Sequence, residues 1–187
     1  MSAPEIRFLA CADGRRVAFS VQGTGPVLLC PAWWVSHLQR DRQDPAFAAF
    51  FDRLGAGMTL VMHDAPTTGL SDRSGPPATL STAADILTRL AAELGAARYS
   101  LFAMSFAGPA ALHHAAGNPA VSRIVFFGSL ATGSALGPPE VRAAFAALVR
   151  AHWGRGARAL ADLMIPGADP QAVAALARLM RASATPE

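Results

Sequence analysis

The apolar positions of the chain fall into short blocks that follow two different periods. Residues 27–30 and most of 58–62 are apolar without alternation, which is typical of strands buried on both faces of a sheet. Residues 45–54 instead carry large apolar side chains at helical spacing. Extended along the chain, the pattern predicts strands at 6–10, 16–21, 27–30, 58–62, 99–103 and 122–127, and helices at 45–54, 79–94 and 106–116.

Turn and capping residues mark the ends of these elements. Asp13-Gly14 is the dipeptide expected at a two-residue hairpin turn, so the chain should open with an antiparallel hairpin. In the helix at 79–94 we expect Ser81 to be the N-cap and Gly95 to end the helix.

Strands alternate with helices from residue 27 onward, which predicts a doubly wound, mostly parallel sheet of the α/β class, opened by the antiparallel hairpin. From Pro138 the texture changes to three alanine-rich helical stretches, at 139–153, 156–164 and 169–182, with no further strand. We therefore predict an α/β core over residues 1–137 and a helical cap segment over 138–187.

Composition narrows the class of protein. With 187 residues, of which 52% are hydrophobic, the chain can bury a sizeable core. Its 16 basic residues are all arginine but are spread along the chain, so no nucleic-acid partner is expected. Neither a signal peptide nor a membrane span is evident, which predicts a cytoplasmic protein without a membrane partner. Cys11 and Cys30 match no metal-binding spacing, and His63-Asp64 lacks a third ligand, so neither metal nor cofactor is expected.

Ser105 has the clearest catalytic signature. It stands in Ala103-Met104-Ser105-Phe106-Ala107-Gly108, between a predicted strand and a predicted helix, which is the context of a nucleophile elbow. Small residues avoid collisions at such a bend, and we expect Gly108 to relieve some of the crowding. The Phe106 N–H would then point toward a developing oxyanion. The alternative is a helix-capping serine without chemistry.

The loop after the strand at 27–30 is expected to complete this site. An oxyanion hole needs a second donor from the loop, and we assign it to the backbone N–H of Trp33. Trp34, His37 and Met104 are candidates for the lining of a substrate pocket, which would suit an apolar acyl or alkyl group. Core packing explains the tryptophans nearly as well, and a loop-packing role is equally open for His37.

Several motifs, taken in order, resemble the α/β-hydrolase superfamily over nearly the whole chain. They are Asp13-Gly14, Gly23-x-Gly25-Pro26, Trp33 through Leu38, Asp64 through Asp72, and Ser105 in its elbow. The stretches 35–38, 69–72 and 165–170 are similar to those of a bacterial subgroup whose hydrolase domain occurs alone or joined to adenylate cyclase or LuxR-type regulatory domains. The resemblance implies the α/β-hydrolase fold, with Ser105 as the nucleophile of a serine hydrolase acting on ester-like small molecules.

Two departures from the superfamily pattern matter. The arginine and glycine-rich turn usual after Asp64 are replaced by Ala65-Pro66-Thr67-Thr68, which removes an ion pair and bears on the order of this loop. In this fold the catalytic acid and histidine follow the nucleophile on later strands. The histidines after Ser105 are all in predicted helical segments: His113, His114 and His152.

We therefore expect the C-terminal strands and the catalytic Asp and His to be missing, and the chain to be inactive or weakly active as given, because a serine without its base is a poor nucleophile. Whether the chain is an enzyme stays open. The alternative is a non-catalytic small-molecule-binding or regulatory module with the same fold. In both cases the partner is a small-molecule substrate or ligand, and self-association through an exposed sheet edge is expected.

Overall fold

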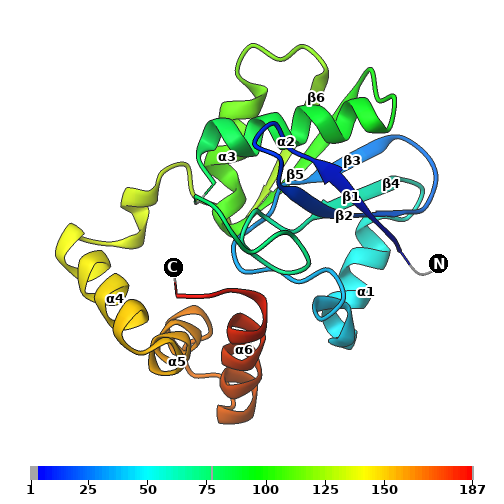
Figure 1. Cartoon of the computed structure of the whole chain (residues 1–187). Coiled ribbons are helices and arrows are strands. Elements are labelled where there is room, and N and C mark those ends of the chain that lie inside the picture. The colour runs from blue at the N-terminus through cyan, green and yellow to red at the C-terminus, as the bar shows by residue number, and fades with distance from the viewer. Residues whose placement is uncertain (1–3, 77, 187) are drawn as a thin grey trace. The chain divides into compact units, whose positions relative to one another are not determined.

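The computed structural model describes residues 4–76 and 78–186. It contains two compact units, Met1–Thr132 and Gly133–Glu187, shown together in Figure 1. The second unit begins with the short 3-10 helix η3 (Gly133–Leu136). The division into an α/β core over 1–137 and a helical cap over 138–187 stays a prediction.

A six-stranded sheet forms the centre of the first unit. The strands lie in the order β1-β2-β4-β3-β5-β6, and their bounds are β1 Glu5–Ala10, β2 Arg16–Gln22, β3 Val27–Cys30, β4 Thr59–His63, β5 Tyr99–Met104 and β6 Val121–Phe127. The β1–β2 and β2–β4 pairs are antiparallel, whereas β4, β3, β5 and β6 run parallel to one another. This topology confirms the predicted class, a mostly parallel sheet opened by an antiparallel hairpin.

The hairpin turn differs from its prediction. Cys11 and Arg15 still pair, since the Cys11 N–H donates to the Arg15 carbonyl at 2.7 Å, which leaves residues 12–14 as the loop. Gly14 has a φ of +82°. A loop of this length with glycine in the left-handed conformation is the next most common hairpin type after the two-residue turn. The two-residue turn was therefore wrong, although Gly14 does make the bend.

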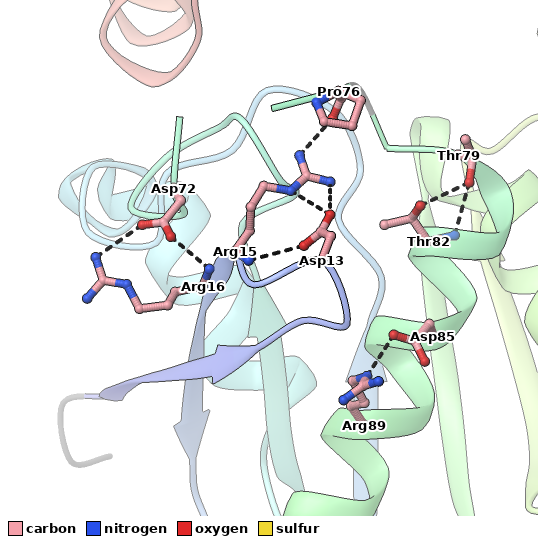
Figure 2. A network of polar contacts seen from close by, with 9 residues as sticks. All are labelled: Asp13, Arg15, Arg16, Asp72, Pro76, Thr79, Thr82, Asp85 and Arg89. Atoms are coloured by element: carbon pink, nitrogen blue, oxygen red, sulfur yellow. Dashed lines mark hydrogen bonds and ion pairs between the residues drawn. The ribbon is translucent and has the colours of Figure 1, made fainter. Parts of the chain in front are cut away.

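Helices cover both faces of the sheet (Figure 1). On one face α1 (Pro45–Leu54) buries Phe51 against β3 and β4, and on the other α2 (Leu80–Glu93) buries Ile86, Leu87 and Leu90. The helix α3 (Gly108–Ala115) packs on the same face as α2. Thr79, not Ser81, caps α2 by accepting the Thr82 N–H at 3.1 Å (Figure 2), because the helix begins one residue before Ser81.

Two arginines at the start of β2 tie the hairpin to the segment that follows β4 (Figure 2). Arg15 is 9% exposed, and its guanidinium forms an ion pair with Asp13 and donates to the Pro76 carbonyl at 2.7 Å. The Arg16 backbone N–H donates to Asp72 at 2.8 Å, and its side chain forms an ion pair with the same carboxylate. These bonds attach the segment at 72–76 to the hairpin, whereas residues 65–68 contain no arginine.

The strand β6 lies at the edge of the sheet and exposes apolar side chains. Val125, Phe126 and Phe127 are 52%, 48% and 54% exposed. Because neighbouring side chains of a strand alternate between faces, the three residues present apolar surface on both sides of the sheet. Self-association through this edge stays a prediction.

The second unit is helical, as the sequence predicts for this region. It contains α4 (Pro139–Ala151), α5 (Trp153–Met164) and α6 (Pro170–Ser183). Small residues allow the helices to pack closely: Ala157 and Ala161 are fully buried, and a side chain at Gly156 would collide with the Val149 backbone. In the described parts of the chain, 4–76 and 78–186, no helix is long and apolar enough to cross a membrane.

Candidate functional site

Ser105 lies where β5 ends and helical structure begins. Its φ of +52° falls in the left-handed region, which residues other than glycine rarely adopt. The 3-10 turn η2 (Ser105–Ala107) follows at once and leads into α3. Ala103 and Ala107, two positions to either side, are fully buried in the core. Ser105 therefore has the strained strand-to-helix backbone that a nucleophile elbow requires.

The segment after β6 holds the elbow in this conformation. The Ser105 carbonyl accepts hydrogen bonds from the Ser129 hydroxyl at 2.6 Å and from the Leu130 N–H at 3.4 Å. A Cβ at Gly108 would overlap the Leu130 carbonyl oxygen and meet the Ser129 hydroxyl. The glycine is thus needed for a long-range approach of two backbones, whereas sequence reasoning had assigned it to crowding within the turn.

The Ser105 hydroxyl is not engaged by the described part of the chain. The residue is partly exposed, and its side chain has no hydrogen-bond partner among residues 4–76 and 78–186. His114, on the helix that follows, bonds the Tyr99 hydroxyl at 2.7 Å and so serves the core, while His113 is exposed. His152 belongs to the helical unit. The described residues of the first unit thus bring no base to Ser105.

The two tryptophans after β3 have different surroundings. The Trp33 ring stacks on Phe51 with centroids 5.5 Å apart, which anchors the start of the loop in the core. The Trp34 ring lies 5.0 Å from the ring of Phe106, the residue after Ser105. The structure therefore brings the loop and the elbow together through Trp34 and Phe106. The oxyanion-hole role of the Trp33 and Phe106 N–H groups stays a prediction.

The two other predicted pocket residues are engaged in packing. His37 is buried, its Nδ1 accepts the Arg40 N–H at 3.4 Å, and burial lowers the pKa of its imidazole. Met104 is partly buried and packs against the core cluster on the α1 side of the sheet. These contacts match the loop-packing alternative for His37, and substrate contact by either side chain stays a prediction.

Asp64 organises the loops at this edge of the sheet, a role that sequence reasoning missed. Its fully buried carboxylate accepts bonds from the Ser36 hydroxyl at 2.8 Å, the Leu38 N–H at 3.2 Å and the Leu70 N–H at 2.8 Å. A side chain at Gly69 would overlap this carboxylate, so only glycine fits there. The signal that could have revealed the role is an aspartate directly after a buried strand, followed closely by a glycine.

Burial dominates the electrostatics of this region. It raises the carboxyl pKa of Asp64, and it raises that of Asp41 to about 7, although the His37 N–H donates to Asp41 at 3.0 Å. Neither carboxylate forms an ion pair with a described residue. Within the described residues, no group of three or more His, Cys, Asp and Glu side chains could hold a metal ion.

The structure of the chain matches those of known proteins, whereas its sequence matches no family model and no curated protein. An esterase from Exiguobacterium antarcticum superimposes with a TM-score of 0.78 at 15% identity, over 96% of this chain and 69% of that one. An alpha/beta hydrolase from Sphaerobacter thermophilus gives 0.69 at 22% identity, over 94% and 68%. The chain has the α/β-hydrolase fold.

A third match is the enol-lactonase from Burkholderia xenovorans, with a TM-score of 0.70 at 22% identity, over 94% of this chain and 66% of that one. Two of these neighbours are named as an esterase and an enol-lactonase and the third as an alpha/beta hydrolase, and this chain spans 66–69% of their lengths. In an α/β-hydrolase the elbow serine is presented at the carboxyl edge of the sheet. Ser105, which follows β5, occupies that edge.

Proposed function

We propose that Ser105 is the nucleophile of a serine hydrolase that acts on ester-like small molecules. The observation that carries the proposal is the strained φ of +52° at a serine whose hydroxyl has no described partner. Backbone strain at a non-glycine residue costs about 1–3 kcal/mol, and such strain concentrates at functional sites. If Ser105 only capped α3, its hydroxyl would accept a hydrogen bond from a backbone N–H of the first turn. Neither η2 nor α3 has such a side-chain cap bond.

In this mechanism the Ser105 Oγ attacks the carbonyl carbon of the ester, and its proton passes to a histidine base. The N–H groups of Phe106 and Trp33 stabilise the tetrahedral oxyanion. Collapse of the intermediate expels the alcohol, which takes the proton, and leaves the acyl group on Ser105 until water releases the acid. The contact between the Trp34 and Phe106 rings supports an apolar wall for the acyl or alkyl group.

The proposal takes the histidine and the acid from sequence outside the 187 residues, which makes the chain inactive or weakly active by itself. Two facts support this: the Ser105 hydroxyl has no histidine partner among the described residues, and the chain spans 69% of the length of the similar esterase. We place the chain in the bacterial subgroup with adenylate cyclase or LuxR-type fusions on the strength of residues 35–38 and 69–72.

Intact-mass analysis after treatment with a fluorophosphonate tests the nucleophile directly. Wild type, Ser105→Ala and Ser100→Ala are incubated with the probe under the same conditions, and circular dichroism verifies that each is folded. Ser100 lies on β5, the strand that leads to Ser105, and bonds the Ser122 hydroxyl, so Ser100→Ala is the matched control. We expect one adduct on wild type and on Ser100→Ala, and none on Ser105→Ala. Labelling should be slow, because an oxyanion hole without its base retains only about 10³–10⁴-fold acceleration.

Two results contradict the proposal. Folded wild type that gains no adduct would favour the non-catalytic binding or regulatory module. An adduct that persists on Ser105→Ala would place the reactive group at another residue.

A further inference from the structure

A cavity of about 260 Å³ lies at the carboxyl ends of β3 and β4, beside the first turns of α2. Its lining is mostly apolar and includes Pro31, Ala32, Pro66, Leu80, Ile86 and Ala110. No arginine, aspartate or glutamate is among its described lining residues. It is larger than the roughly 150 Å³ apolar cavity that holds a benzene molecule in an engineered protein. The cavity has room for a small ring.

The one polar side chain in the lining without a described partner is His63, at the end of β4. It is 3% exposed, and neither nitrogen of its ring makes a hydrogen bond with any residue that the structure describes. The other polar side chain, Thr79, is occupied as the N-cap of α2 (Figure 2). Buried polar groups are nearly always hydrogen-bonded, so the imidazole calls for a partner that the described residues do not supply.

The charge of His63 limits what that partner can be. Burial lowers the pKa of its imidazole to about 4, so the ring is neutral at pH 7 and offers one donor and one acceptor nitrogen. With no charged side chain in the lining, the cavity would leave an ionic ligand unpaired, at a high desolvation cost. The chemistry of the lining therefore selects an uncharged molecule.

We propose that this cavity binds a compact, uncharged, largely apolar molecule of phenol size, whose single hydroxyl group hydrogen-bonds the His63 imidazole. Pro31 and Ala32 directly precede Trp33, so the ligand lies against the base of the loop that bears Trp34. The site is separate from Ser105, which does not line the cavity. The proposal does not depend on hydrolase activity.

Phenol and toluene are suitable probes, because they share a ring and differ in the hydroxyl. Binding is followed by NMR titration, with the ¹⁵N shifts of the His63 ring as the readout of the hydrogen bond. Phenol should bind wild type with a dissociation constant of about 1 mM or lower. His63→Leu should weaken phenol binding by about tenfold, the usual value of one such bond, and leave toluene binding unchanged.

Cavity filling gives an independent test. Ala83 lines the cavity from α2, and Ala83→Leu should abolish binding of both probes. Ala92→Leu, on the exposed side of the same helix, is the control and should bind phenol as wild type does. The proposal is overturned if phenol causes no saturable shift in folded wild type, if His63→Leu binds phenol as tightly as wild type, or if Ala83→Leu still binds it.

Discussion

Two turns at the same edge of the sheet, after β4 and after β5, use the same backbone device for different ends. Each contains a non-glycine residue with positive φ, Thr67 at +71° and Ser105 at +52°. Each also contains a glycine at a point of close approach: Gly69 against the Asp64 carboxylate, and Gly108 against the Leu130 carbonyl. Strain and a tightly packed glycine are therefore not enough to distinguish a catalytic turn from a structural one.

The difference lies in what the polar side chain of each turn does. The Asp64 carboxylate is fully buried, and the Ser36 hydroxyl and the Leu38 and Leu70 N–H groups occupy it. The Ser105 hydroxyl is partly exposed and has no partner in the described parts of the chain. A reactive group is available for chemistry only where the fold does not consume it. On this criterion the β4 turn is structural and the β5 turn is the catalytic candidate.

The largest effect on stability is expected at Gly69, in the turn after β4. The methyl group of an alanine at this position would overlap the Asp64 carboxylate, and the alanine would have to adopt a φ of +54°. We expect Gly69→Ala to lower the free energy of unfolding by about 2–4 kcal/mol, because overpacking of a buried site costs about 1–3 kcal/mol and the left-handed conformation of an alanine costs about 1 kcal/mol more. Urea denaturation followed by circular dichroism measures the loss.

Gly95→Ala is the matched control for Gly69→Ala. Gly95 has a similar φ, +61°, but open space around its Cβ position. Gly95→Ala should lower the free energy of unfolding by only about 1 kcal/mol, the cost of the left-handed conformation alone. Equal losses in the two variants would show that the Asp64 network contributes little to stability.

The loop held by Asp64 contains a second buried carboxylate, and its titration provides a pH test. Burial raises the pKa of Asp41 to about 7, above the value of about 3.9 in an unfolded chain. Between these values the folded state binds a proton that the unfolded state does not, so the wild-type free energy of unfolding should fall as pH rises from about 4 to about 7. Asp41→Asn removes this group and should lose roughly 3 kcal/mol less stability than wild type between pH 5 and pH 8, because about two pH units of this interval lie below the folded pKa.

Unfolding curves in urea at pH 5 and at pH 8 measure this effect. The dependence of the free energy of unfolding on pH that remains in Asp41→Asn comes in part from Asp64, whose pKa is also raised by burial. Wild-type stability that rises between these two pH values would contradict a buried, protonated Asp41.

Local patterns account for what could be predicted. The uninterrupted apolar runs predicted the parallel strands, and the strand-to-helix junction predicted the bend at Ser105, because both depend on neighbours in sequence. The Asp64 network joins residues 28 positions apart, from Ser36 to Asp64, and the Gly108 contact reaches Ser129 and Leu130. Contacts of this kind leave no periodic signal in one sequence. Ser81 was wrong as the N-cap because Thr79, two positions earlier, offers the same hydroxyl chemistry.

The smallest expected effect separates strain from function. Glycine adopts a positive φ without strain, so Ser105→Gly should be more stable than Ser105→Ala by about 1 kcal/mol, after the entropy of a more flexible unfolded chain is subtracted. Thr67→Gly should likewise be more stable than Thr67→Ala by about 1 kcal/mol. Thermal unfolding of the four variants tests both differences.

Fluorophosphonate labelling of the same variants then sharpens the comparison of the two turns. Both Thr67 variants should label as wild type does, because the β4 turn contributes no reacting group, while both Ser105 variants should not label at all. Ser105→Gly that is less stable than Ser105→Ala would show that the elbow stores no strain. Loss of labelling in Thr67→Gly would show that the β4 turn shapes the catalytic site, and the division between a structural and a catalytic turn would have to be given up.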